Sequence, residues 1–565
     1  MKLETGRVGM IDSTLTGRVN VYLGSLVLTA FAVRLVWIWH FTGVMENEGA
    51  AYARIAENLF SGKGYIGILG GRDTLLPPLY PVLMRIGAQI AGSMEAGGRL
   101  VSALTSSLLV LPGFVLAQRL WGDGAGWWCA GLLAFHPLLV SFGSTTYCES
   151  TYLLLLFAAF VMSLRLLEKP ATRRAVLTGA LFGLAELVRP HALAYPVTAA
   201  AILLASALWD KAGRKRAISS AVVFVVAVVI FFPYIAYLSI NSGYLRLEGK
   251  SLVNNIIGVR MRNGMSYAEA ACGLGPNMQP EGPYLTADGF DIRWPEAFPG
   301  GVPLLANHLE GILWRTFDTL KAILTFEPFG SLLFAGVAAI GFFLTLGSRL
   351  RLRDNLAYLC LVGLYFPILL AVEFRWNRYL LPWLPMLTPW AAVGLAGLQR
   401  LVRQRLEQLI PRGGRFPALA GYVLPAVVVV AIAARSLPAV LKLGELSEGR
   451  DQSLRLTGEW LRLHGGEGRT VMGISAVIPY YAGASLAYLP YADQTQALEY
   501  VRGVDPAYIV IRESDRHRAP YLPLWLHHGL PDPCAEEAYR HESPDGDHVV
   551  VFRWNCGQVS RQSRP

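Results

Sequence analysis

Residues 19–41 read VNVYLGSLVLTAFAVRLVWIWHF, and residues 46–65 read ENEGAAYARIAENLFSGKGY. The first run is long enough to cross a membrane, since a spanning helix needs about 20 apolar residues. It has no small-residue cleavage site, so we expect a retained helix rather than a signal peptide. In the second run, apolar residues recur at helical spacing and end at the stop signals Gly62 and Gly64. The stretch predicts a membrane span followed by a short amphipathic helix on the membrane surface.

The composition of the whole chain agrees with this beginning. Of its 565 residues, 53% are hydrophobic and 16% are charged, whereas soluble domains average about 25% charged. Mean hydropathy is +0.40. These values exclude a soluble enzyme, a disordered chain and a disulfide scaffold. The net charge of +10 is better explained by cytoplasmic Lys and Arg in a membrane protein than by nucleic-acid binding.

Ten further apolar runs predict spans near residues 98–118, 126–142, 150–166, 175–188, 192–209, 217–240, 328–347, 355–372, 379–398 and 417–434. A twelfth run, 77–94, is ambiguous. If it does not cross, one set of alternate connections holds 20 Lys and Arg residues, and the three short opposite connections hold 3. If it crossed, every later loop would change sides and the positive-inside bias would invert. We therefore expect 77–94 to lie along the outer surface.

The resulting map is an all-α polytopic membrane protein with about eleven spans and a small C-terminal α/β extracytoplasmic domain. It has a cytoplasmic tail (1–18), a transmembrane domain (19–434) with outer loops 42–99 and 241–327, and an outer domain (435–565). The second loop ends in a surface helix near 307–325. Strands are expected at 470–474, 507–512 and 549–554, with helices near 476–482 and 496–501 between them. Cys534 and Cys556 both lie in this outer domain and can pair.

Five ionisable residues fall where predicted spans meet the outer surface: Glu48, Glu149, Arg189, Arg375 and Arg378. Charged groups at membrane depth are costly, so each needs a partner or a function. Arginine binds phosphate through a planar fork, and a nearby carboxylate can take a proton from a hydroxyl. The set fits a site for an anionic lipid head group. The alternative is that the arginines reach lipid phosphates and the acids are their counter-ions.

Short motifs in a fixed order add to this pattern. They are EGAAY (48–52), AENL (56–59), GKGY (62–65), PPLYP (77–81), GRL (98–100), RLWG (119–122), Glu149, Arg189-Pro190 and RYLLP (378–382). In these motifs the chain resembles a GT-C glycosyltransferase of the bacterial family-39 type, related to protein O-mannosyltransferases and lipid A aminoarabinose transferases. The resemblance spans residues 19–400 and extends more loosely into the tail.

This resemblance implies a GT-C fold in the cytoplasmic (inner) membrane and a polyprenyl-phosphate sugar as donor. The sugar would move, with inversion, to a hydroxyl of a glycan, glycolipid or protein outside the membrane, and no nucleic acid is involved. Glu48 would be the general base, and Glu149 would position the acceptor or orient an arginine. The donor phosphate would contact Arg378, Arg375 and Arg189. The substrate cavity would be lined by Tyr52, Tyr379, His191 and Glu46.

Several alternatives stay open. Glu46 competes with Glu48 as the base, and Arg72 or Lys63 can replace a lysine that aminoarabinose transferases carry before the loop proline. No dense carboxylate cluster or CxxC motif calls for a metal ion, although metal dependence varies among GT-C enzymes. A transporter or flippase would need polar groups within the spans, where Arg34 and Glu186 are the candidates. A membrane sensor that binds glycan through its tail is the third possibility.

Overall fold

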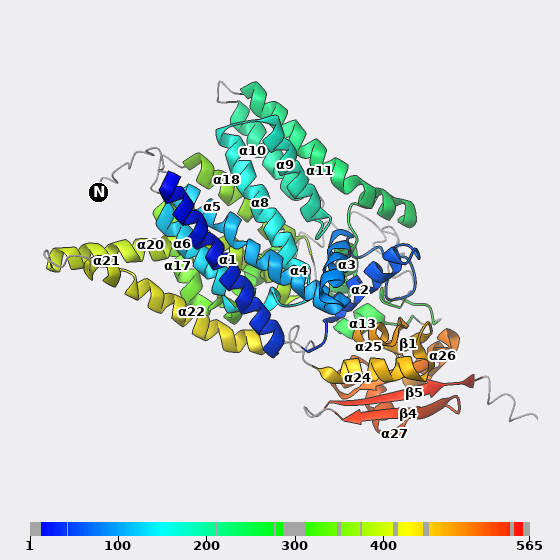
Figure 1. Cartoon of the computed structure of the whole chain (residues 1–565). Coiled ribbons are helices and arrows are strands. Elements are labelled where there is room, and N and C mark those ends of the chain that lie inside the picture. Colours follow the sequence, from blue (N-terminus) through cyan, green and yellow to red (C-terminus); the bar gives the residue numbers. More distant parts are fainter. Residues whose placement is uncertain are drawn as a thin grey trace, which may run out of the picture.

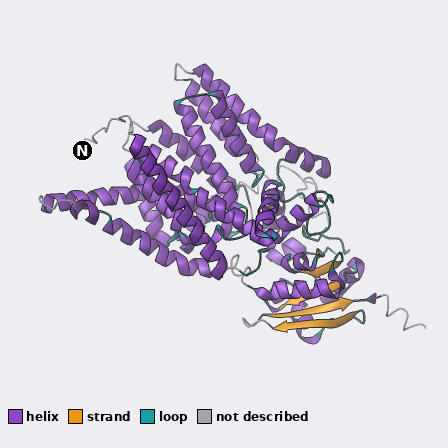
Figure 2. Cartoon of the chain, viewed as in Figure 1, coloured by secondary structure: helices purple, strands orange, loops and turns teal. Residues whose placement is uncertain are grey.

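The computed structural model describes residues 13–41, 43–191, 193–208, 213–275, 278–285, 311–346, 352–372, 376–410, 416–443, 451–542 and 547–556. These residues form a long helical bundle with a small sheet domain at one end (Figures 1 and 2). The short helices α2 (Asn47–Phe60), α3 (Leu79–Ala91) and α13 (Tyr267–Cys272) lie between the bundle and the sheet domain (Figure 1). Helices α20 and α21 reach the opposite end of the bundle (Figure 1).

Helices occupy all eleven predicted spans, which makes the chain a multi-pass membrane protein. Seven of the described helical segments are long and apolar enough to cross a bilayer, and Ala194–Ala207 and Leu332–Leu346 are shorter apolar helices. The elements are α1 (Ser13–Phe41), α4 (Met94–Leu108), α5 (Val110–Trp121), α6 (Asp123–Phe135), α7 (Pro137–Phe142), α8 (Glu149–Glu168), α9 (Thr172–Glu186), α10 (Ala194–Ala207), α11 (Gly213–Ser242), α17 (Ser331–Leu346), α18 (Leu352–Gly363), α19 (Tyr365–Leu370), α20 (Trp383–Leu409), α21 (Phe416–Ala420) and α22 (Val423–Leu441).

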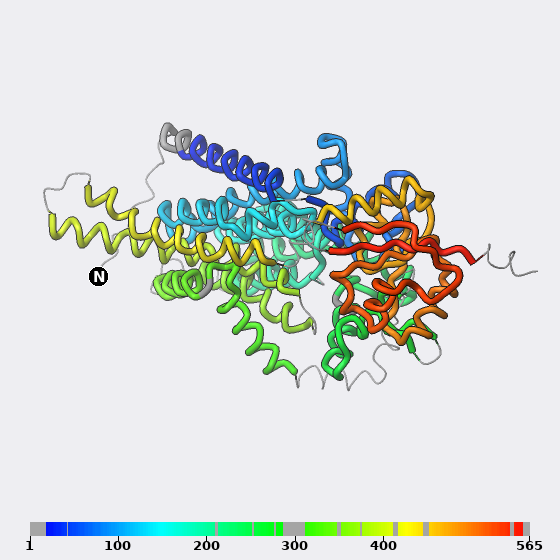
Figure 3. Tube along the Cα trace, turned by 90° about the horizontal axis from the view of Figure 1, so that it is seen from below, coloured from blue at the N-terminus to red at the C-terminus, as the bar shows by residue number. Residues whose placement is uncertain are grey.

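Burial separates a central helix from peripheral ones. In the span that contains α20, 89% of the most apolar window is buried, against 17% for α1. The exposed side chains of α1 are large and apolar, as Leu28, Val36 and Trp39 show, which suits contact with lipid. Figure 3 shows α1 along one edge of the bundle. The central α20 begins directly after the 3-10 turn η3 (Asn377–Leu380), so it fixes the position of Arg378.

Arg34 closes a break in the middle of one predicted span. Helices α6 and α7 are separated at His136, and Pro137 has no N–H to donate to the carbonyl of Leu133. The buried guanidinium of Arg34 supplies the missing donors, with Nη2 3.2 Å from the Leu133 oxygen and Nη1 3.0 Å from the Ala134 oxygen. Arg34 thus completes the hydrogen bonding of the backbone rather than lining a transport path.

The outer helices come from the two long loops. They are α2 (Asn47–Phe60), α3 (Leu79–Ala91), α12 (Lys250–Arg262), α13 (Tyr267–Cys272) and α16 (Ile312–Thr325), followed by the turn η1 (Glu327–Phe329). Helix α3 has 13 residues, or about 20 Å, which is too short for a hydrocarbon core of about 30 Å. The expectation that 77–94 does not cross therefore agrees with the helix length. Helix α16 exposes Leu313, Trp314 and Phe317, as an interfacial helix would.

The C-terminal domain is built on one mixed sheet in the order β2-β1-β3-β5-β4. Strands β1, β2 and β3 run parallel, and β5 pairs antiparallel with both β3 and β4. Its elements are α24 (Gln452–Leu461), η5 (Arg462–Gly466), β1 (Thr470–Gly473), α25 (Val477–Ala482), β2 (Ser485–Tyr488), α26 (Gln494–Val504), β3 (Tyr508–Arg512), η6 (Glu513–Arg518), α27 (Leu522–His528), β4 (Ala535–Glu542) and β5 (His548–Trp554).

The predicted α/β character of this domain is confirmed, and a disulfide joins Cys534 to Cys556. Strands β2 and β4 and helix α27 were not among the predicted elements. The sequence of β4, AEEAYRHE, is polar and rich in residues that are uncommon in strands. It is a strand because β5 pairs with it along its length.

Replacing Arg34 with Met tests its structural role. The carbonyls of Leu133 and Ala134 would lose their donors inside the bundle, so the free energy of unfolding should fall by about 3 kcal/mol. Titration of the purified protein with SDS measures the change. Arg403→Met is the matched control, because Arg403 is exposed and pairs with Glu407 one turn away. An Arg34→Met variant that unfolds like the wild type would contradict this role.

Candidate active site

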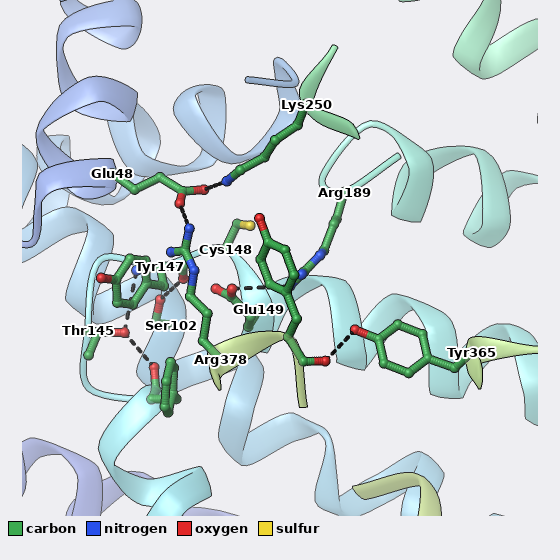
Figure 4. A network of polar contacts seen from close by, with 12 residues as sticks. Glu48, Ser102, Thr145, Tyr147, Cys148, Glu149, Arg189, Lys250, Tyr365 and Arg378 are labelled. Atoms are coloured by element: carbon green, nitrogen blue, oxygen red, sulfur yellow. Dashed lines mark hydrogen bonds and ion pairs between the residues drawn. The ribbon is translucent and has the colours of Figure 1, made fainter. Parts of the chain in front are cut away.

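The centre of the site is a carboxylate bound to two cations. Glu48, in the first turn of α2, accepts a hydrogen bond from Lys250 Nζ at 2.9 Å and a close one from Arg378 Nη2. Lys250 begins α12 and Arg378 lies in η3, so the three side chains come from three distant parts of the sequence (Figure 4). The predicted meeting of Glu48 and Arg378 therefore occurs. All three side chains are at least two-thirds buried.

Lys250 is placed by close packing of the second outer loop against the first. Gly249 lies against the backbone of Thr74, where a Cβ atom would have no room. Arg246 donates to the carbonyl oxygens of Glu248 and Gly249 at 3.1 and 2.9 Å. These contacts fix the turn before α12, and the first side chain of that helix then points at Glu48.

The two cations decide the charge of Glu48. Burial of the carboxyl group would by itself raise its pKa, but the Arg378 guanidinium and the Lys250 ammonium hold the pKa of Glu48 well below its usual range. Glu48 is therefore ionised at neutral pH. Tyr52, one turn further along α2, donates from its hydroxyl to Glu48 Oε1 at 3.1 Å. Burial raises the pKa of Tyr52 well above its usual value, so this hydroxyl keeps its proton.

A second ion pair lies beside the first. Arg189 Nη1 is 3.1 Å from Glu149 Oε1, and the Arg189 guanidinium carbon lies 4.8 Å from the centre of the Tyr379 ring. The Arg378 guanidinium carbon lies 4.7 Å from the centre of the Tyr147 ring. Glu149 Oε2 is buried and accepts no hydrogen bond from the described residues. Each of the two arginines thus lies over a tyrosine ring, which favours its positive charge.

A cavity of about 70 Å³ opens between these groups. Its polar side includes Glu48, Glu149, Arg189 and Lys250, and its apolar side includes residues of α19 and of the turn after α9. Arg378 is bonded to Glu48 but does not itself line this cavity. The lining residues are Glu48, Tyr52, Leu75, Leu76, Pro77, Cys148, Glu149, Val188, Arg189, Pro190, His191, Glu248, Lys250, Asn254, Tyr365, Ile368, Leu369, Val372 and Tyr379. Among the residues that the structure describes, no three His, Cys, Asp or Glu side chains could hold a metal ion.

Glu46 takes a different position from Glu48. It is 2% exposed, and its carboxylate accepts hydrogen bonds from the backbone N–H of Thr146, at 2.9 Å, and from the Thr146 hydroxyl. Burial raises the pKa of Glu46, although Arg99 and Thr146 oppose the rise. Glu46 therefore ties the first outer loop to the turn before α8, and it is absent from the lining of the cavity.

The remaining predicted site residues divide as follows. Tyr52, Glu149, Arg189, His191 and Tyr379 all line the cavity. The His191 ring packs against Tyr152, with ring centres 5.1 Å apart. Arg375 lies outside the described residues. Arg72 donates to Asn241 and Lys63 is exposed, and neither lines the cavity, whereas Lys250 does.

Lys250, Asn254 and Cys148 line the cavity without having been predicted. Asn254 donates to the Tyr379 hydroxyl oxygen at 3.0 Å, and Cys148 Sγ lies 3.2 Å from the Tyr52 hydroxyl oxygen. Lys250 and Asn254 come from a polar loop in which no pattern separates them from neighbouring polar residues. Only Cys148 could have been proposed as a cavity residue from the sequence, because it stands next to Glu149.

Comparisons with known proteins agree on the fold. A family model described as dolichyl-phosphate-mannose-protein mannosyltransferase matches residues 76–237. A search of curated proteins found no match. Among solved structures, ArnT from Cupriavidus metallidurans bound to undecaprenyl phosphate is similar with a TM-score of 0.54 and 15% identity, covering 95% of this chain and 98% of that one.

The oligosaccharyltransferase of Archaeoglobus fulgidus is also similar. Its structure tethered with an acceptor peptide gives a TM-score of 0.56 and 14% identity, with 95% of this chain and 74% of that chain covered. A complex of the same organism's AglB with an inhibitory peptide and a dolichol-phosphate gives a TM-score of 0.56 and 13% identity, with 95% of this chain and 74% of that chain covered. The fold is that of the GT-C glycosyltransferases, as the motifs predicted, and the family match together with these neighbours indicates a glycosyltransferase of this class.

The ion pairs of Glu48 predict how stability depends on pH. The carboxyl of the unfolded chain titrates at about pH 4, and the folded one titrates below that value. The stabilisation is therefore complete above about pH 5 and is lost as the pH falls through the folded pKa. The difference in unfolding temperature between wild type and Glu48→Gln should be largest at pH 7 and should shrink below about pH 4. Glu407→Gln, on the exposed end of α20, is the control, and a difference that grows on acidification would be the contrary result.

Proposed function

We propose that the protein transfers a sugar from a polyprenyl-phosphate donor to an acceptor hydroxyl on the outer face of the cytoplasmic membrane, with inversion at the anomeric carbon. The observation that carries the proposal is the Glu48 carboxylate paired with Arg378 and Lys250 beside a cavity with an apolar wall. Structural neighbours described with undecaprenyl phosphate and dolichol-phosphate support a lipid-phosphate donor.

The donor phosphate would bind the cations that hold Glu48 in the free protein. Arg378 offers a planar fork that suits two phosphate oxygens, and Lys250 adds a second positive charge. Arg189 lies on the same cavity and can contact the phosphate from its other side. The lipid chain would leave along the apolar lining formed by Ile368, Leu369 and Val372.

This arrangement couples donor binding to the basicity of Glu48. In the free protein the two cations keep Glu48 a weak base. A phosphate that takes over their hydrogen bonds would relieve this effect, and the pKa of Glu48 would move up toward its ordinary range. A carboxylate of ordinary basicity in a buried cavity is a competent acceptor for a hydroxyl proton. Glu48 would thus become active only when the donor is present.

The reaction is then a single displacement. The acceptor oxygen forms a bond to the anomeric carbon while its proton passes to Glu48. The bond between that carbon and the phosphate oxygen breaks, and its electron pair stays on the lipid monophosphate. Arg378 and Lys250 stabilise this leaving charge. Glu149, whose Oε2 has no donor among the described residues, is placed to accept a hydrogen bond from a substrate hydroxyl.

A transport function has less support. Arg34 donates to Ser106 and to three backbone carbonyls. Glu186 accepts from the backbone N–H of His191 at 2.6 Å. Both candidate residues for a transport path are therefore used to satisfy local hydrogen bonds.

Glu48→Gln tests the general base. The amide keeps the shape of the side chain but cannot take the proton, so kcat should fall by at least about 100-fold. Binding of undecaprenyl phosphate should persist. Transfer is measured by incubating the purified protein with a panel of polyprenyl-phosphate sugars and candidate acceptors, followed by mass spectrometry. Glu46→Gln is the matched control, and it should keep transfer within about tenfold. Full transfer by Glu48→Gln would refute the proposed base.

Arg378→Met tests the phosphate site. Loss of the guanidinium should weaken binding of undecaprenyl phosphate by about tenfold or more, because a charge-assisted hydrogen bond contributes about 1.5–3 kcal/mol. A binding titration in detergent measures the effect. Arg119→Met is the control, since Arg119 pairs with Glu168 and Asp354, whereas Arg378 pairs with Glu48. Equal weakening in the two variants would argue against a phosphate site at Arg378.

A further inference from the structure

The C-terminal domain holds the helix that carries Glu48. Asn47 immediately precedes Glu48 at the start of α2. Its side-chain oxygen Oδ1 accepts hydrogen bonds from Ser475 Oγ at 3.0 Å and from the backbone N–H of Ala476 at 2.8 Å. Ser475 and Ala476 form the connection between β1 and α25. One residue of α2 is thus bound by the outer domain while the next residue reaches the cations of the cavity.

Further contacts follow along the same helix. Arg54 Nη2 lies 3.2–3.4 Å from the carbonyl oxygens of Pro479, Tyr480 and Ala484. The Tyr480 hydroxyl donates to Glu57 Oε1 at 2.8 Å. Helix α2 is therefore fixed to α25 from its first turn to its third. Figure 1 shows α2 and α25 side by side at the junction between bundle and sheet domain.

Asn47 is bound next to a crevice at the carboxyl ends of β1 and β3. In the order β2-β1-β3-β5-β4 the chain passes from β1 to β2 on one side and from β3 to β4 on the other, so the connections diverge between β1 and β3. Open α/β sheets bind their ligands in the crevice at the carboxyl ends of such strands. Here that crevice keeps a volume of only about 10 Å³, and Ser475 and the Arg512–Asp515 ion pair line it.

The start of α2 depends on this external contact. Its N-cap residue, Glu46, makes no side-chain capping bond to the helix, because its carboxylate is bonded to Thr146. The first turn, in which Glu48 meets its two cations, therefore lacks a side-chain cap from Glu46, and the contact of Asn47 with Ser475 and Ala476 is a further hold on it. A displacement of about 1 Å in a catalytic group can cost about 100-fold in rate.

We propose that the C-terminal domain holds the start of α2 through the connection that follows β1, and that Asn47 and Ser475 are positioning residues for Glu48. The domain is then a working part of the active site rather than a separate glycan-binding module. This inference rests on the proposed function in so far as Glu48 is the base, but its structural part can be tested without any transfer assay.

The first test separates binding from turnover. Asn47→Leu removes the acceptor at nearly constant size, and Asn47→Asp keeps an acceptor oxygen for both donors. Asn47→Leu should lower kcat by about tenfold or more while the KM for the donor changes by less than about threefold, and Asn47→Asp should restore most of the rate. The donor is the polyprenyl-phosphate sugar that the wild type uses in the panel above. Tyr521→Phe is the control, because it removes a buried hydrogen bond to Pro490 within the same domain and should leave kcat unchanged.

The pH dependence of kcat/KM distinguishes a positioning role of Asn47 from a loss of folded protein. If Asn47→Leu lets Glu48 move away from its cations, the pKa of Glu48 rises and the acid limb of the kcat/KM profile moves to higher pH. A general loss of folded protein would scale the whole profile without shifting it. An unshifted profile with an unchanged kcat would overturn the proposal.

The second test needs no substrate. The change in unfolding temperature caused by Glu48→Gln at pH 7 is measured in the wild type and in the Ser475→Ala and Asn47→Leu backgrounds. If the contact positions Glu48, this change should shrink by about half or more in both backgrounds, but not in Tyr521→Phe. Equal changes in every background would refute the positioning role even if transfer is confirmed. Full transfer by Glu48→Gln, with the coupling present, would refute the proposed base alone.

Discussion

The interaction on which the site depends is the buried contact of one carboxylate with two cations. Glu48 could not stay ionised in its surroundings without Arg378 and Lys250, and neither cation would be tolerated there without an anion. The three residues belong to the first outer loop, the second outer loop and the start of the central helix. The ion pairs between them therefore connect the parts of the chain that enclose the cavity. It also leaves the cations ready for exchange, since a phosphate can replace Glu48 as their partner.

The rest of the fold supplies rigid supports for these three points. Arg378 stands directly before α20, the most buried of the long helices, so it has little freedom to move. Lys250 follows a turn packed tightly against the first loop. Glu48 sits on α2, which packs against α3 and α4, and the sheet domain contacts the same helix. A C-terminal domain of ordinary composition thus becomes necessary to a site in the membrane domain.

Much of this architecture could be predicted from the sequence, because hydropathy and the distribution of Lys and Arg act over whole segments. The spans, helix α2 and the α/β domain all follow from such patterns. Contacts between distant loops leave no comparable trace. Lys250 resembles other polar loop residues in sequence, and only packing at Gly249 selects it. Likewise, the sequence showed Arg34 only as a polar residue within a span. Pro137, which gives Arg34 its structural role, lies about one hundred residues away in the chain.

An experimental structure of the protein with a polyprenyl-phosphate ligand bound would test the central claim most directly. The account predicts that the phosphate lies within hydrogen-bond distance of Arg378 and Lys250. Glu48 should be released from both cations and should face the position of the anomeric carbon, while Asn47 stays bound to Ser475. A phosphate bound elsewhere, with the Glu48 ion pairs intact, would contradict the account.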